Sequence, residues 1–198
     1  MNIRLTAQIA AAALIVLASP ACSQQTTTTP LALADIPAAG QSGLKVTSPA
    51  FKDGGDIPYE NTQYRTNTFP GLAWAGTPPG TRSVAVIMQD SDIVYGGHYV
   101  LHWTLFNIPG GQTSLPVGMT TAPAGATYGP SYLGAAKPYV GPKTPAGHRD
   151  HYHFQIFALD TVLPSDAAAT GFKGLSDAMK GHVLASGELV GIGQAPPN

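Results

Sequence analysis

The amino-acid sequence predicts a mostly β domain, a sandwich or a barrel with minor helix, and three observations support this fold class. Gly (23 residues) and Pro (18 residues) are spread over the 198-residue chain without a repeat period. That pattern excludes collagen and coiled coil and argues against a helix bundle. Apolar residues make up 43% of the chain, enough to bury the core of one domain of this size. Short apolar runs alternate with turn residues, as in proteins with many strands.

The first 21 residues have the features of a secretory signal peptide. Arg4 is the lone positive charge, residues 9–18 form a ten-residue apolar run, and Ser19-Pro20-Ala21 supplies small residues before a cleavage point. Ten apolar residues are too few for a membrane-spanning helix, which needs about 20. The alternative is a buried helix of the domain, and the Thr- and Gln-rich sequence that follows at once argues against it.

Cys22 is the only cysteine of the chain, so an internal disulfide or a zinc site built on cysteine pairs is excluded. Cleavage after Ala21 would expose Cys22, and the segment resembles the lipobox of bacterial lipoproteins, although Ser19 stands where that motif prefers Leu. We expect Cys22 to be lipidated and to tether the domain to a membrane without a spanning helix. The alternative is an ordinary signal peptide with an incidental cysteine.

Residues 22–43 are expected to form a flexible tether. Four consecutive Thr and a Pro end at position 30, small residues fill 38–43, and the segment shows no sustained period. The folded domain is therefore expected at 44–198.

The first strands of the domain are expected in its amino-terminal half. Residues 69–74 form a short extended segment whose proline suits an edge strand or a strand start. Residues 82–89 are apolar and β-branched, which predicts a central strand buried on both faces. Residues 99–108 form a second apolar run of strand length.

The carboxy-terminal half is expected to add two strands and little helix. Residues 152–159 alternate between apolar and polar positions, and 183–192 form a last strand interrupted by Gly187. A convincing helical pattern occurs only at 175–182, with a second helical turn expected at 164–170.

The charge balance bears on the partners of the domain. Lys and Arg number 10 against 11 Asp and Glu, which gives a net charge of −1. A broad basic face for nucleic acid is therefore excluded.

Polar residues that can carry chemistry gather at strand ends. Asp90 and Asp92 follow the strand 82–89 directly and project the same way if the chain stays extended; a solvated turn is the alternative. His102 lies inside the next apolar strand, where a satisfied core histidine is the alternative to a functional one. His98 precedes it by four residues, but two histidines without a third ligand are weak evidence for metal, and we expect none.

A Gly/Pro-rich loop at 139–147 leads into a cluster of three histidines and an arginine at 148–153. Such a loop holds its backbone in irregular shapes that can aim N–H groups at an anion, and the cluster adds donors and positive charge. A plain connecting loop is the alternative. The sequence contains no G-x-S-x-G nucleophile elbow, no P-loop and no H-E-x-x-H motif. We therefore expect a protein that is not an enzyme.

These clusters, in this order, resemble the phosphatidylethanolamine-binding protein family, specifically its bacterial Raf-kinase-inhibitor-like branch. The similarity runs from about residue 44 to 193 and is carried by segments at 46–51, 70–74, 84–92, 102–109, 139–142, 152–160 and 181–191.

The resemblance implies a sandwich of two antiparallel sheets with one or two short helices and a small pocket for an anion such as phosphate or carboxylate. By position, the two motif aspartates of the family fall on Asp90 and Asp92. Its pocket histidine falls on His102, and its Gly-Pro loop on Gly141 and Pro142.

Two departures from the family pattern affect the site. The proline of the aspartate motif is absent, because Val94 stands in its place. The family's His-Arg-Tyr triplet falls on Asp150, His151 and Tyr152. A local shift would bring His148 to the pocket wall, or His151 would replace the missing imidazole; Tyr152 is the safer member.

The groups themselves suggest how the pocket works. We expect His102 and backbone N–H groups of 141–142 to bind the anion by hydrogen bonds and partial positive charge. Asp90 would act on the imidazole or on a cationic part of the ligand, because a bare carboxylate repels an anion. Apolar walls are expected from Trp103 and Phe106, together with the tyrosine of the triplet.

The expected function is non-catalytic binding of a small anionic ligand or a phospholipid head group in the periplasm or cell envelope, without a cofactor. Two alternatives stay open. One is an envelope hydrolase or lyase that uses Asp90 and His102 as an acid/base pair. The other is an inhibitor of an envelope enzyme that works through the pocket rim. The sequence leaves a homodimer open as well.

Overall fold

The computed structural model describes residues 30–40, 43–134 and 137–197. The expected signal peptide and Cys22 lie outside the described residues. Within the described ranges, no helix has the length and apolar character needed to cross a membrane.

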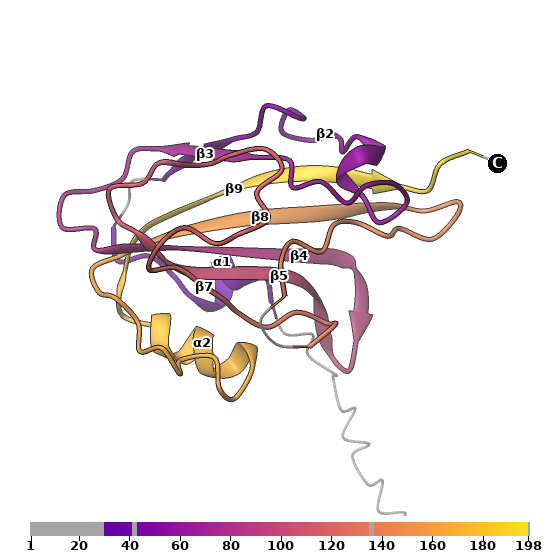
Figure 1. Ribbon diagram of the computed structural model, residues 1–198. Helices are drawn as coiled ribbons and strands as arrows, with labels where there is room; N and C mark the ends of the chain where they lie inside the picture. Colours follow the sequence, from indigo (N-terminus) through magenta and orange to yellow (C-terminus); the bar gives the residue numbers. More distant parts are fainter. Residues whose placement is uncertain (1–29, 41–42, 135–136, 198) are drawn as a thin grey trace, which may run out of the picture.

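Two β-sheets pack on each other, which confirms the predicted fold class. The smaller sheet has three antiparallel strands in the order β1 (Lys45–Thr47), β3 (Leu72–Ala75) and β6 (Ser114–Leu115). Figure 1 shows β3 on one side of the long strands and α2 on the other. The molecule is therefore layered as small sheet, large sheet and helices.

The larger sheet has six strands in the order β2-β9-β8-β4-β5-β7. Its long members are antiparallel neighbours, and the two short strands lie at its edges. Among the described strands, only the pairing of β2 with β9 is parallel, which departs from the expected antiparallel sheets. The strand bounds are β2 (Gly55–Asp56), β4 (Ser83–Tyr95), β5 (His98–Pro109), β7 (Thr127–Tyr128), β8 (Arg149–Leu159) and β9 (Val183–Gln194).

Helix is minor, as predicted. The described helices are α1 (Ala32–Asp35), the 3-10 helix η1 (Tyr59–Asn61) and α2 (Phe172–Met179). Helix α2 lies three residues earlier than the expected 175–182 and ends just before Gly181, whose φ of +81° is left-handed. Residues 164–170, expected as a helical turn, form turns rather than helix.

The central strand β4 is buried on both faces, as its apolar run predicts. Val86 and Met88 point into the core between the two sheets. Ala85 and Ile87 point the other way, into a second core that α1 and α2 cover. We call the side of the large sheet toward the small sheet its inner face, and the side toward the helices its outer face.

The expected tether at 22–43 is wrong for its described part, because α1 docks on the outer face. Ala32 and Ile36 have no exposed surface. The backbone N–H groups of Ala32 and Leu33 donate to Oε1 of Gln89 and Oε1 of Gln155, each at 2.8 Å. These two glutamine amides lie on an otherwise apolar face, and the free N–H groups of a helix start satisfy them.

Candidate functional site

A cavity of about 540 Å³ opens at one end of the large sheet. The paired positions Asp90↔Val100 and Asp90↔Tyr152 bring β4, β5 and β8 together there. Its lining residues come from these strands and from the loops between them: Asp90, Ile93, Tyr95, Val100, His102, Tyr132, Lys143, Pro145, Asp150 and Tyr152.

A β-bulge turns His102 into this cavity. Met88 pairs with Trp103 and Gln89 pairs with Leu101, so His102 is the extra residue on β5. Strict alternation would have grouped His102 with Phe106. Instead the bulge breaks that alternation: Trp103 and Leu105 face the core between the sheets, and Phe106 belongs to the outer-face core.

The expected apolar walls are therefore wrong for two of the three aromatic residues. Trp103 is buried in the core between the sheets and Phe106 in the outer-face core, and neither lines the cavity. The aromatic surfaces next to His102 are Tyr132 and Tyr152, whose ring centroids each lie 5.0 Å from the imidazole centroid in edge contacts.

The imidazole of His102 is neutral and has a fixed orientation. Its Nδ1 lies 3.2 Å from the carbonyl oxygens of both Val140 and Gly141. A carbonyl only accepts, so Nδ1 carries the hydrogen and donates, which leaves the lone pair on Nε2 for a ligand. Burial lowers the pKa of His102 to about 4, against the opposing effect of these two hydrogen bonds. The pocket histidine is thus an acceptor, not the expected donor.

The Gly141-Pro142 loop does not supply N–H groups to the cavity, which corrects the expected role. The N–H of Gly141 donates to Oδ1 of Asn67 at 2.8 Å, and Pro142 has no N–H. The loop instead presents carbonyl oxygens: that of Gly141 also accepts from Nε2 of Gln63 at 2.7 Å. Its role is to hold His102 in one tautomer.

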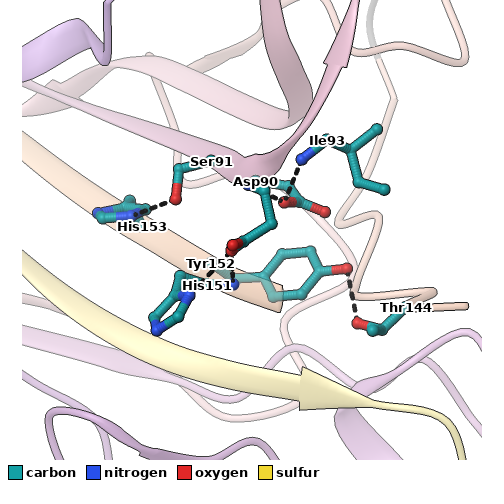
Figure 2. Close-up of polar contacts among 8 residues, drawn as sticks. Asp90, Ser91, Ile93, Thr144, His151, Tyr152 and His153 are labelled. Atoms are coloured by element: carbon teal, nitrogen blue, oxygen red, sulfur yellow. Dashed lines mark hydrogen bonds and ion pairs between the residues drawn. The ribbon is translucent and has the colours of Figure 1, made fainter. Parts of the chain in front are cut away.

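Asp90 is buried, with 2% of its surface exposed. Its Oδ1 accepts the backbone N–H groups of Asp92 at 2.9 Å and Ile93 at 3.3 Å, and Figure 2 shows this turn beside the ring of Tyr152. Burial, followed by the nearby charge of Asp150, raises the pKa of Asp90 to about 6, although the backbone N–H of Asp92 opposes the shift. Because β4 turns here, Asp90 and Asp92 do not project together as an extended chain would require.

Asp92 and His151 pair with each other outside the cavity lining. Oδ2 of Asp92 accepts from the backbone N–H of His151 at 2.6 Å and lies 2.8 Å from its Nδ1. Burial raises the pKa of Asp92, but the hydrogen bonds from His151 outweigh it and hold that pKa below its usual value. His148 is exposed and is not among the lining residues. Neither histidine therefore supplies the missing imidazole.

Asp150 lines the cavity, where the sequence predicts either His148 or His151. It is 1% exposed, and its Oδ2 has no hydrogen-bond partner among the described residues. Burial, followed by the charge of Asp92, raises the pKa of Asp150. Residues two apart on a strand share a face, so the position of Tyr152 alone would have pointed to Asp150.

Tyr152 lines the cavity as expected and is held by a hydroxyl pair. Its Oη lies 3.0 Å from Oγ1 of the buried Thr144, and Figure 2 shows this contact at the far end of the ring. Lys143, Tyr95 and Tyr132 also line the cavity. They lie on loops or at a strand end, where the sequence offers no periodic signal.

No group of three or more His, Cys, Asp or Glu residues that could hold a metal ion occurs in the described part of the chain. The polar inventory of the cavity is thus two buried carboxyl groups, a neutral imidazole, tyrosine hydroxyls and one lysine.

The chain is similar to a family of proteins with this architecture. The family model described as phosphatidylethanolamine-binding protein matches residues 47–194. A UPF0098 protein of Methanothermobacter thermautotrophicus is 36% identical over 152 residues, which cover 75% of this chain and 97% of that protein. The Mycobacterium tuberculosis protein named "Putative lipoprotein LppC" is 34% identical over 139 residues, which cover 70% of this chain and 66% of that protein.

A solved structure agrees with the sequence relatives. The crystal structure of E. coli YbcL, described as a new member of the mammalian PEBP family, superposes with a TM-score of 0.70 at 30% identity. The match covers 78% of this chain and 100% of that chain.

Proposed function

The chain belongs to the phosphatidylethanolamine-binding protein family, and on that premise we propose that it is an exported binding protein whose pocket takes a small ligand by a phosphate or carboxylate group. The observation that carries the proposal is the convergence of three polar side chains on one cavity. Asp90, His102 and Tyr152 come from three strands, and each is at most 4% exposed while lining that cavity. Few, buried and convergent polar groups in an apolar surround are typical of a ligand site.

The tautomer of His102 decides which anions fit. Its Nδ1–H is committed to the carbonyl groups of Val140 and Gly141, so Nε2 accepts a hydrogen bond from the ligand. A phosphate group that keeps one proton can donate that proton to Nε2. Sulfate carries no proton near neutral pH and cannot. The pocket therefore favours a protonated phosphate group, with the exposed Lys143 at the rim supplying the positive charge.

The rim of the cavity suits a ligand that has an apolar part next to the anion. Tyr95 is 84% exposed and Tyr132 is 45% exposed, and both line the cavity. Exposed aromatic rings at a pocket mouth offer apolar area with a polar tip. A phosphomonoester lipid such as phosphatidic acid, whose phosphate group keeps a proton near neutral pH, has this character.

The pocket binds without catalysing a reaction in this proposal. His102 is oriented by backbone carbonyls, and Asp90 accepts backbone N–H groups, so the two do not form the acid/base pair that the hydrolase alternative needs. None of the described lining residues is Ser, Thr or Cys. The inhibitor alternative stays a prediction that uses the same rim.

The test of the binding proposal is a titration of the full chain, followed by NMR chemical shifts, with inorganic phosphate, phosphoethanolamine and sulfate. We expect phosphate and phosphoethanolamine to shift resonances of the residues that line the cavity. Sulfate should bind at least about tenfold more weakly. His102→Ala should lose most of the affinity, because a hydrogen bond to a charged group contributes about 1.5–3 kcal/mol. Lys143→Ala, an exposed position, tests the charge without disturbing the core.

His182→Ala is the matched control, because His182 is an exposed histidine paired with Asp160 at 2.9 Å, a partner that does not line the cavity. Equal phosphate affinity in the wild type and the His102→Ala variant would remove His102 from the site. Absence of binding for all three ligands at millimolar concentration would refute the proposed function.

A short-chain phosphatidic acid, a phosphomonoester like phosphoethanolamine, tests the rim separately. It should bind more tightly than phosphoethanolamine, and Tyr95→Ser should remove that gain while leaving phosphate affinity unchanged. An equal loss for both ligands would show that Tyr95 supports the pocket rather than an apolar tail.

The location of the protein is part of the same proposal. The apolar run before Cys22 and the printed name of the M. tuberculosis relative both support a lipoprotein of the cell envelope. Fractionation of cells that express the wild type should place the protein with membranes. Cys22→Ser should release it to the soluble envelope fraction, and an unchanged distribution would contradict lipidation.

A further inference from the structure

Three polar side chains form a hydrogen-bonded row on the outer face of the large sheet, away from the pocket. Nε2 of His153 lies 3.0 Å from Oγ of Ser91, and Nδ1 of His153 lies 2.9 Å from Oε2 of Glu188. The three residues come from the neighbouring strands β4, β8 and β9. Figure 2 shows the contact between Ser91 and His153 at one end of the drawn group and that between Tyr152 and Thr144 at the other. We call these residues the outer-face triad.

The hydrogen bonds fix the tautomer of His153. A carboxylate only accepts, so Nδ1 carries the hydrogen and donates it to Glu188. Nε2 then holds the lone pair and accepts from the hydroxyl of Ser91. This is the arrangement of nucleophile, base and orienting carboxylate in serine hydrolases, which recurs on unrelated folds and is recognised by geometry rather than by sequence position.

The sheet holds the outer-face triad in place while leaving it reachable. The side chain of His153 is 13% exposed and that of Glu188 is 38% exposed, and Ser91 is half-buried. His153 pairs in register with Gln89 on one side and Val190 on the other. Ser91 follows the last ladder pair between β4 and β8, where β4 becomes irregular. A base held by the ladder thus meets a nucleophile just beyond the last pair between β4 and β8.

Other histidine–carboxylate pairs of the chain differ in one respect. His182 lies 2.9 Å from Asp160, and His151 lies 2.8 Å from Asp92, each through Nδ1. Among the contacts of the described residues, only His153 also reaches a serine hydroxyl through its second nitrogen. The triad is therefore more than a surface ion pair.

From this geometry we propose that Ser91 is a nucleophile for acyl transfer from small, accessible carboxylic esters, with His153 as its base. Oγ of Ser91 attacks the ester carbonyl carbon and forms a C–O bond, while its proton passes to Nε2 of His153. The bond to the leaving alcohol breaks, and that oxygen takes the proton back from His153. Water then cleaves the acyl-Ser91 ester by the same route, releasing the carboxylic acid and restoring the serine.

Glu188 is a positioning residue in this proposal, because it touches His153 and not the ester. Its charge favours the imidazolium that forms when His153 accepts the proton. Ser91, His153 and Glu188 do not line either of the described cavities, so substrate binding contributes little. The expected acceleration is that of general base catalysis alone, roughly 10²- to 10⁴-fold.

The test is covalent labelling of the full chain with a fluorophosphonate, in which Oγ of Ser91 displaces fluoride from phosphorus, followed by peptide mass spectrometry. We expect one labelled site at Ser91. Ser91→Ala should abolish the label, and His153→Asn should slow it at least about a hundredfold. His182→Asn, the matched control, should label at the wild-type rate. Hydrolysis of p-nitrophenyl acetate should follow the same order.

Two further measurements separate a catalytic from a structural role. Nitrogen NMR of the folded protein should show the Nδ1–H tautomer of His153, and Glu188→Gln should change that signature and slow labelling about tenfold. Imidazole in solution should restore labelling of a His153→Gly variant. Labelling of Ser91 at equal rates in the wild type and His153→Asn, or label on other residues only, would overturn the proposal.

Discussion

The imidazole of His102 donates its Nδ1–H to the carbonyl oxygen of Gly141, 3.2 Å away, so the loop that was expected to face the anion faces the histidine instead. The ligand then meets the lone pair of Nε2 and the carboxyl group of Asp90 in a cavity with a single lysine among its described lining residues. Binding of an anion at this site therefore depends on the protonation of the ligand and of the Asp90 carboxyl group.

Affinity for anions should rise as the pH falls through about 6. Burial raises the pKa of Asp90 to about 6, so above that pH its carboxylate repels an anion, and below it the neutral carboxyl group can donate. Sulfate is the suitable probe because it gains no proton in this range. We expect roughly tenfold tighter binding at pH 5 than at pH 7.5, measured by calorimetry. Asp90→Asn should bind sulfate with little pH dependence, and a slope equal to that of the wild type would contradict the role of Asp90.

The same carboxyl group should make the fold less stable as the pH rises. The pKa of Asp90 is higher in the folded protein than its value of 3.8 in an exposed chain. The folded state therefore binds the proton more tightly, and its stability falls between about pH 4 and pH 6. Asp90→Asn keeps an oxygen for the two backbone N–H groups and carries no charge. Urea unfolding should show the variant to be more stable than the wild type at pH 7, with the difference shrinking below pH 4; a constant difference would refute the linkage.

The docked helix α1 should contribute measurably to stability. Ile36 has no exposed surface, so Ile36→Ala should lower the free energy of unfolding by about 2–4 kcal/mol. Val162→Ala is the control, because Val162 is 53% exposed and should change the stability by less than about 0.5 kcal/mol. If both variants unfold at the same urea concentration as the wild type, the segment does not support the fold.

The loop that orients His102 should not tolerate a side chain at Gly141. A Cβ at this position would lie 2.4 Å from the carbonyl oxygen of Asn61, so the backbone must shift. We expect Gly141→Ala to cost about 1–3 kcal/mol of stability and to weaken phosphate binding about tenfold by misplacing His102. Gly111→Ala, where a Cβ meets nothing within 4 Å, should change neither quantity in thermal unfolding or titration.

Most of the fold could be predicted from sequence because its long strands carry their own signal. The apolar run at 82–89 corresponds to the amino-terminal half of β4, and the alternation at 152–159 corresponds to the carboxy-terminal part of β8. Helix α1 escaped prediction because its four residues are too short for a helical period. Its partners Gln89 and Gln155 lie 57 and 122 residues away in the sequence.

Three residues of the site could be predicted from sequence, but the direction in which β5 turns its other side chains could not. Resemblance to the family pointed to Asp90, His102 and Tyr152, which meet at the cavity. The bulge at His102 resets the alternation of β5, which no local pattern reveals, and Phe106 therefore faces the opposite core. The outer-face triad depends on contacts 62 and 35 residues apart, which only the folded sheet brings together.

The anchoring of α1 on Gln89 and Gln155 also limits how far the folded domain can lie from a lipid on Cys22. Eight residue steps separate Cys22 from Pro30, where the described chain begins its approach to the sheet. A fully extended chain of that length spans at most about 29 Å, whatever conformation it takes. With lipid on Cys22, the domain would stay within a distance of the membrane surface that is smaller than the thickness of a bilayer. It could bind only ligands and proteins that lie near its own anchor.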